Sequence, residues 1–274
     1  MSILTTTHYD PLLSQKLGLG TRSDDGPLLN SCFGDWTYRL NEVLASKDYG
    51  LDRNYRKSPD REIFAVCRKH AAKYANPKPG KDAVLLTHPF YLSLAHMNRI
   101  HTPEAERDLD AYESALMRLL EVKRASDSFE LVFLETAHHY AGATSLLLEQ
   151  GTVDDVIFTR CDSGQLMDSK DLRRFEGVNV YFGGGYNNRC LTSSLDDFVS
   201  ENGMGRLWLL RELLLNSPLD CLHELRPGIV HLNSRRFPKN RMMGLDEALG
   251  ALASGDCLLP AGCVRILLSI KGLR

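Results

Sequence analysis

The sequence lacks the features that mark a membrane or nucleic-acid-binding protein. Its 33 basic and 35 acidic side chains give a formal net charge of −2, so no overall field draws it to nucleic acid or to a membrane surface. No apolar run approaches the roughly 18 to 20 residues that cross a bilayer. The first residues, MSILTTTHYDPLL, hold no basic stretch followed by an apolar one, so we expect no signal peptide. We therefore expect a cytoplasmic protein with no membrane partner.

Cysteine and histidine patterns typical of metal sites are also absent. The seven cysteines are scattered, and no two of them form a Cys-x-x-Cys pair. This favours reduced thiols over a disulfide framework or a structural zinc site. His96 and His101 are five positions apart, and the adjacent His138 and His139 point to opposite sides of an extended chain. The sequence therefore predicts no metal and no other cofactor.

No established nucleotide-binding motif is present. Gly183-Gly184-Gly185 lacks the third glycine of a G-x-G-x-x-G fingerprint and the Gly-Lys-Ser/Thr of a P-loop. The densest basic segment, residues 235–241, holds a single aromatic residue and is typical of a solvated loop in a chain of balanced charge. We therefore expect no nucleic-acid partner.

What the sequence does contain, from residue 83 onward, is a regular alternation of strand-like and helix-like patterns. Short apolar runs typical of buried strands occur at 83–87, 129–134, 153–159, 178–182, 228–232 and 263–270. Helices are expected between or after them at 103–125, 142–150, 169–175, 192–200, 204–216 and 245–253. This alternation predicts an α/β fold, a three-layer sandwich with a mainly parallel, doubly wound sheet.

Residues 1–80 differ from the rest of the chain. They are rich in Gly, Asp, Ser and Pro, but they also contain several aromatic residues, which argue against disorder. Helices are expected around 34–46 and 60–74, the second because apolar residues recur with helical spacing. The run Pro77-Lys78-Pro79-Gly80 is the best boundary signal. We therefore predict an N-terminal helical extension over 1–80 and an α/β domain over 81–274.

The turn that follows the run at 178–182 is the strongest candidate for a functional site. Ligands bind open α/β sheets at the carboxyl ends of strands. Glycine lets the backbone approach a ligand closely, and a helix start offers N–H groups and a positive dipole. A thiol placed there is easier to ionise. Cys190, at the expected helix start, is therefore the candidate nucleophile.

Two histidines are candidates for the general base that a cysteine nucleophile requires. His88 directly follows the run at 83–87, and His138 lies just after the run at 129–134. The carboxyl ends of parallel strands share one edge of a sheet, so both histidines are expected near Cys190.

A substrate anion is expected to bind beside the cysteine. Arginine pairs with carboxylates and phosphates through two parallel hydrogen bonds, and backbone N–H groups of the turn can stabilise an oxyanion. The predicted binding residues are Arg160, Gly184, Gly185, Asn187, Asn188 and Arg189.

Three functions remain open on this evidence. The first is a cysteine-nucleophile hydrolase or transferase that acts on a small carboxylate- or amide-containing substrate. The second is a non-catalytic α/β module that binds a nucleotide or another anion at the Gly183–Gly185 turn, with Cys190 packed as a small apolar residue. The third is a homo-oligomer or partner-binding protein that uses an apolar helix over residues 207–215 as its interface.

Several segments between about residues 83 and 203 occur in an order known from one family. They are Ala83 to His88, Leu131 to His138, Asp155 to Arg160, Lys170 to Phe175, and Gly184 to Leu191. This layout resembles the isochorismatase-like cysteine hydrolases, which include nicotinamidases and related amidases. The resemblance implies a doubly wound α/β fold and hydrolysis by a cysteine.

Two of the three catalytic positions that the resemblance implies hold other residues here. The family has an Asp after the first strand, a Lys after the third and a Cys at the helix start, where this chain has His88, Arg160 and Cys190. Arginine does not donate a proton usefully at neutral pH. A reaction in this chain would therefore use a Cys–His pair in place of the family's site.

Overall fold

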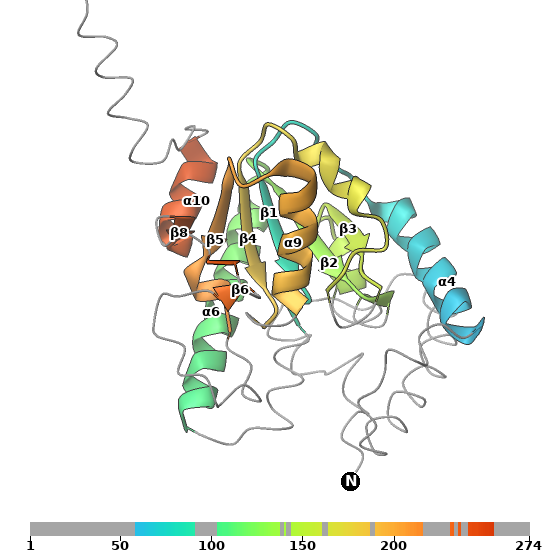
Figure 1. Cartoon of the computed structure of the whole chain (residues 1–274), viewed down its shortest axis with the longest axis horizontal. Helices are drawn as coiled ribbons and strands as arrows, with labels where there is room; N and C mark the ends of the chain where they lie inside the picture. Colours follow the sequence, from blue (N-terminus) through green and yellow to red (C-terminus); the bar gives the residue numbers. More distant parts are fainter. Residues whose placement is uncertain are drawn as a thin grey trace, which may run out of the picture.

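A six-stranded sheet between two helical layers forms the body of the protein (Figure 1). The computed structural model describes residues 58–90, 103–137, 140, 144–160, 164–186, 190–215, 231–232, 235–236 and 241–254. The strand order is β3-β2-β1-β4-β5-β8, and every pairing in this sheet is parallel. The predicted three-layer α/β sandwich with a doubly wound sheet is confirmed.

The strands form where short apolar runs stand, because a parallel strand covered on both faces is apolar on both. Every residue of β1, β2, β4 and β5 is buried. The strands of the sheet are β1 (Ala83–Thr87), β2 (Glu130–Glu135), β3 (Asp155–Phe158), β4 (Val180–Gly184), β5 (Leu207–Leu210) and β8 (Met242–Met243). The first four lie within two residues of the predicted runs.

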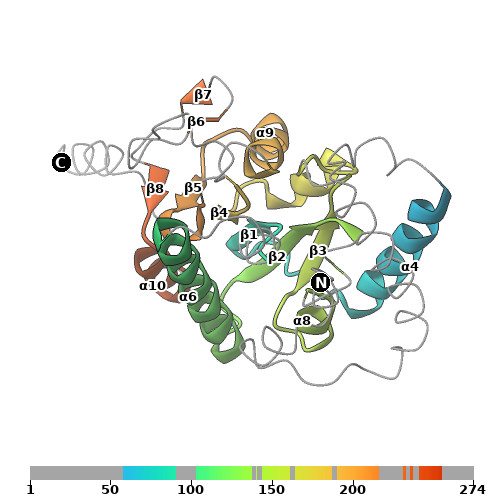
Figure 2. The same cartoon turned by 90° about the horizontal axis from the view of Figure 1, so that it is seen from below.

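The helices cover both faces of the sheet. Figure 2 shows α6 and α10 on one side of the strands and α9 on the other. The helices are α4 (Ser58–Tyr74), α6 (Pro103–Ala125), α8 (Ser145–Glu149), α9 (Cys190–Asn202) and α10 (Leu245–Ser254), with 3-10 turns η2 (Ser169–Phe175) and η3 (Arg211–Leu213). The predicted helix over 103–125 is confirmed as α6.

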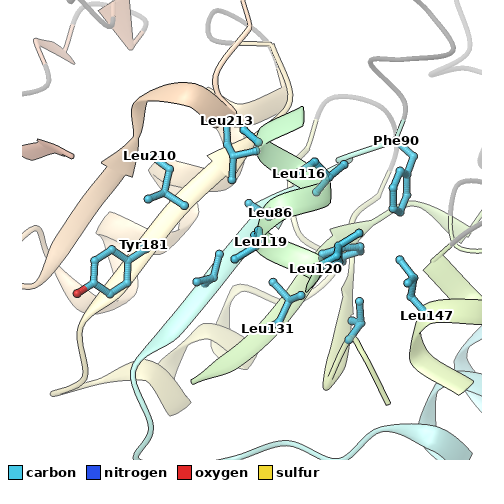
Figure 3. Close-up of a cluster of buried hydrophobic side chains, with 14 of the residues drawn as sticks. Leu86, Phe90, Leu116, Leu119, Leu120, Leu131, Leu147, Tyr181, Leu210 and Leu213 are labelled. Carbon is cyan, nitrogen blue, oxygen red and sulfur yellow. The ribbon is translucent and has the colours of Figure 1, made fainter. Parts of the chain in front are cut away.

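Two apolar cores result from the alternation of side chains along each strand. On β1, Val84 and Leu86 face the larger core, where Figure 3 shows Leu86 packed beneath Leu116 and Leu119 of α6. The alternate residues Ala83 and Leu85 face the smaller core under α9 and η2. The smaller core includes Leu172, Phe175, Leu191, Leu195 and Phe198.

Helix α4 belongs to the segment that precedes the predicted boundary at residue 80, and it packs into the larger core through Cys67 and Ala71. His70 links it to the rest of the domain, since Nδ1 lies 2.6 Å from the hydroxyl of Tyr140 and Nε2 lies 3.0 Å from Oε1 of Glu149. The predicted helix over 60–74 is confirmed. The helix predicted at 34–46 lies outside the described residues.

The prediction of a helix over 204–216 is wrong. Residues 207–210 form β5, buried between β4 and β8, and the short turn η3 follows. A short apolar run reads equally well as a buried strand or a buried helix segment, and periodicity cannot separate the two. The oligomer interface proposed for residues 207–215 therefore loses the helix on which it was based.

Residues 231–232 of the strand predicted over 228–232 do form a strand, but this strand lies outside the main sheet. His231–Leu232 (β6) pairs antiparallel with Arg235–Arg236 (β7) in a separate two-stranded sheet. The place beside β5 is taken by β8, whose two residues are too few to produce a pattern in the sequence. The strand predicted at 263–270 lies outside the described residues.

The amino edge of the main sheet is held by buried ion pairs. Nζ of Lys123, near the end of α6, lies 2.7 Å from Oδ2 of Asp154, and each side chain is 2% exposed. Lys78 pairs with the other oxygen of Asp154 at 2.7 Å. The same Lys123 Nζ donates to the carbonyl of Phe129 at 2.7 Å. A pocket of about 390 Å³ opens beside Lys123 and Thr152 at this edge.

Candidate active site

The carboxyl ends of β2, β1 and β4 lie side by side at the opposite edge of the sheet. Thr87, the last residue of β1, is paired with Leu134 of β2 on one side and with Gly184 of β4 on the other. His88 therefore emerges between Glu135 and Gly185. This arrangement brings residues from three separate segments to one edge.

Cys190 is the first residue of α9 and is 2% exposed. Its Sγ accepts a hydrogen bond from the backbone N–H of Tyr186 at 3.4 Å. The first turn of this 13-residue helix also directs its positive dipole end toward the thiol. Both interactions favour the thiolate over the thiol.

Two glycines of the preceding turn make this placement of the sulfur possible. Gly185 has φ +67°, and a Cβ at this position would lie 2.8 Å from Sγ of Cys190. Gly184 has φ +78°, and its Cβ would lie 2.4 Å from the carbonyl oxygen of Thr87. Both glycines are thus required by close contacts with other atoms of the protein itself.

His88 is fully buried and holds a left-handed backbone conformation, with φ +43°. A non-glycine residue pays about 1–2 kcal/mol for this region, and such strain is concentrated at functional sites. Its N–H donates to the carbonyl of Leu134 at 2.9 Å, and Nε2 lies 2.9 Å from Oγ1 of Thr159. The imidazole is therefore directed past β2 toward the end of β3.

Glu135 and Tyr112 also reach this edge, and neither was among the predicted site residues. The carboxylate of Glu135 is fully buried and accepts a hydrogen bond from Oγ1 of Thr144 at 3.0 Å. The hydroxyl of Tyr112, on α6, donates to the carbonyl of Pro89 at 3.0 Å. Burial raises the pKa of Tyr112 well above its ordinary value, and the negative charges of Cys190 and Glu135 raise it further. Tyr112 is therefore close enough to Cys190 and Glu135 to feel a charge on either of them.

The sequence held a signal for one of these two residues. Glu135 is a charged residue directly after an apolar run, which is the pattern of a polar side chain at a strand end. Tyr112 occupies an apolar position of an amphipathic helix, and nothing in the sequence distinguishes it from a core residue.

Arg160 is exposed and lies beyond the end of β3. Its Nε donates to the carbonyl of Leu166 at 3.1 Å, and its backbone N–H donates to the carbonyl of Gln165 at 2.7 Å. Burial raises the pKa of Asp197 on α9, and the positive charge of Arg160 partly offsets this effect. The guanidinium is therefore near the flank of α9, and its role in binding a substrate stays a prediction.

Four predicted site residues, His138, Asn187, Asn188 and Arg189, lie outside the described residues. Within the part of the chain that the structure describes, no group of three or more His, Cys, Asp or Glu is placed to hold a metal ion. In the same part, no helix has the length and apolar character needed to cross a membrane.

Comparisons with known proteins return one structural likeness to report. No protein-family model and no curated protein matches the sequence. Among solved structures, the chain is similar to one described as an isochorismatase-like hydrolase from Alkaliphilus metalliredigens. The two are 17% identical, and the match covers 63% of this chain and 99% of the other, with a TM-score of 0.39.

Proposed function

We propose that this protein is a hydrolase or transferase that uses Cys190 as its nucleophile on a small carboxylate- or amide-containing substrate. The observation that carries the proposal is the setting of Sγ at the start of α9. There the sulfur accepts the N–H of Tyr186 at 3.4 Å and lies so close to Gly185 that no side chain fits at that position.

A second buried cysteine provides a contrast that supports this role. Cys67 on α4 donates its S–H to the carbonyl of Ala137, with 3.4 Å between Sγ and the oxygen. A thiol that donates to a carbonyl is held in its neutral form, whereas a sulfur that accepts from an N–H is favoured as the thiolate. Of these two cysteines, only Cys190 has the surroundings of a nucleophile.

The reaction would begin when the Cys190 thiolate adds to the substrate carbonyl carbon and the carbonyl electron pair moves to the oxygen. Collapse of this intermediate breaks the bond to the leaving group, which takes a proton from a general acid, and leaves a thioester on Cys190. Water then hydrolyses the thioester, or another nucleophile takes the acyl group. Of the two predicted bases, His88 is directed toward Thr159 and away from β4, so His138 would transfer the protons, and Arg160 and Arg189 would bind the substrate anion.

An anion-binding module without catalysis is the second candidate, favoured by the burial of Cys190. The sequence feature that suggested such a module was the glycine run 183–185. Each of these glycines is required by an internal contact, because a Cβ at Gly183 would lie 2.9 Å from Cβ of Leu213 and those at Gly184 and Gly185 would overlap Thr87 and Cys190. The glycines therefore need no ligand to explain them.

The test is alkylation of the folded protein by iodoacetamide over a range of pH, with each cysteine followed by peptide mass mapping. Cys190 should react ahead of Cys67, at a pH where an ordinary thiol of pKa about 8.5 is still protonated. If Cys190 reacts only when the protein unfolds, together with Cys67, the nucleophile proposal is wrong and the binding module takes its place.

A further inference from the structure

Thr87 carries a buried hydroxyl that no group in the described part of the chain satisfies. The residue is 0% exposed, and its Oγ1 has no hydrogen-bond partner among the described residues. A buried hydroxyl without a partner costs about 1–3 kcal/mol, and folded proteins leave few of them. A valine has the same shape and would avoid this cost, so the hydroxyl itself needs an explanation.

The position of Thr87 in the sheet directs its side chain toward α9. Side chains alternate along a strand, and Ala83 and Leu85 of β1 lie in the smaller core with Leu191 of α9. Thr87 continues this series, so its hydroxyl stands on the face of the sheet that α9 covers. Cys190 begins α9 at the same edge.

The contact between β1 and β4 brings this hydroxyl close to the thiol. Thr87 is paired with Gly184, whose missing Cβ allows the two backbones to approach closely. The next residue, Gly185, lies directly against Sγ of Cys190. Thr87 is thus one strand spacing from the turn that holds the candidate nucleophile.

We propose that the Thr87 hydroxyl is a substrate-contacting group of the Cys190 site and donates a hydrogen bond to the carbonyl oxygen of the bound substrate. This inference depends on the function proposed above. The bond strengthens as Cys190 attacks and negative charge develops on that oxygen. Without substrate, none of the described residues offers this hydroxyl a partner.

The experiment compares two small reagents that react with the same sulfur in different ways. With p-nitrophenyl acetate, the Cys190 thiolate adds to the ester carbonyl, an oxyanion forms, and p-nitrophenolate leaves as the acetyl thioester is made. With iodoacetamide, the thiolate displaces iodide at a CH₂ carbon and no oxyanion forms. A hydroxyl that stabilises the oxyanion accelerates only the first reaction.

Thr87→Val should slow acetylation of Cys190 at least about tenfold, since removal of one oxyanion donor typically costs 10²–10³ in rate. Its alkylation by iodoacetamide should stay within about twofold of the wild type, because both reactions use the same thiolate but only acetylation develops charge on a carbonyl oxygen. Thr87→Ser, which keeps the hydroxyl, should restore most of the acetylation rate. Thr87→Ala provides a second form without the hydroxyl.

Unfolding in urea supplies a readout independent of reactivity. Thr87→Val should be at least as stable as the wild type, because the buried hydroxyl has no bond to lose. Thr152→Val is the matched control at the amino edge: Thr152 is also buried, but its Oγ1 accepts from Nε of Arg124 at 3.2 Å. The control should lose stability and leave both reactions of Cys190 unchanged.

The outcomes separate the two proposals. If wild-type Cys190 reacts with neither reagent before unfolding, the proposed function fails. If the wild type is acetylated and both Thr87→Val and Thr87→Ala are acetylated equally fast, only the role of Thr87 fails. A loss of stability in Thr87→Val as large as that in Thr152→Val would also overturn it, because the hydroxyl would then be structural.

Discussion

The two edges of the sheet treat buried polar groups in opposite ways. At the amino edge, Lys123 and Asp154 are almost completely buried. Asp154 pairs with both Lys78 and Lys123, and Lys123 also donates to the carbonyl of Phe129. At the carboxyl edge, His88 is held in a left-handed conformation, and the hydroxyl of Thr87 has no partner among the residues that the structure describes. The ion pairs at the amino edge satisfy the charges that they bury, whereas the carboxyl edge keeps a strained backbone and a donor without a partner among the described residues. This contrast agrees with the proposal that the carboxyl edge carries the active site, and it predicts that changes at the amino edge affect mainly stability.

The largest effect is expected from Cys190→Ala. If the carboxyl edge is the active site, this change should abolish acetylation by p-nitrophenyl acetate, since no other group replaces the nucleophile. Urea unfolding should change little in comparison. Cys67→Ala is the control, and it should leave acetylation intact. Full acetylation of the Cys190→Ala protein would assign the reaction to another residue.

At the amino edge, Lys123→Ala should lower the free energy of unfolding by about 3 kcal/mol, because it leaves Asp154 buried with one cation fewer. Cys190 reactivity should not change in the folded protein. Lys81→Ala, which removes an exposed pair with Asp127, should cost less than about 1 kcal/mol. Equal losses from the two changes, measured by urea denaturation, would contradict the importance given to the buried pair.

Gly203→Ala should cost about 1–2 kcal/mol, because its backbone is left-handed with φ +70°. Gly185→Ala, with φ +67°, should cost more, because its Cβ would also lie 2.8 Å from Sγ of Cys190. Only Gly185→Ala should also slow alkylation of Cys190, since a Cβ at Gly203 meets nothing within 4 Å. The two variants therefore separate backbone strain from displacement of the sulfur. If both leave alkylation unchanged, the contact of Gly185 with Sγ does not position the nucleophile.

The smallest effect is a pH dependence at the amino edge. Burial raises the pKa of Glu130, and Arg174 offsets this only in part. Between the unfolded and folded pKa values the folded protein binds more protons, so this group contributes stability at lower pH that is lost as the pH rises through the folded value. Glu130→Gln has no ionisable group at this position, so its stability lacks this pH-dependent contribution.

The stability of Glu130→Gln relative to the wild type should therefore increase from acidic to neutral pH. Urea unfolding of both proteins at several pH values measures this difference. A difference that stays constant, or that decreases with rising pH, would show that burial does not dominate at Glu130.

The sequence was sufficient for the part of the fold that depends on pattern. The runs that became β1 to β4 and the amphipathic spacing of α6 predicted the parallel sheet and its helical layers. Residues 207–210 were misread because four buried apolar residues carry no period. The strained backbone of His88, the bond of Tyr112 to Pro89 and the unsatisfied hydroxyl of Thr87 depend on contacts between distant segments. No local pattern in the sequence records them.

The packing of α4 has a practical consequence for anyone who shortens this chain. A version that begins at residue 81 would remove Cys67 and Ala71 from the larger core and would take His70 away from Tyr140 and Glu149. Apolar surface on α8 and β3 would then meet water, which invites aggregation during expression. A shortened chain should therefore begin before Ser58, and poor yield of a shorter one would say nothing about the sheet itself.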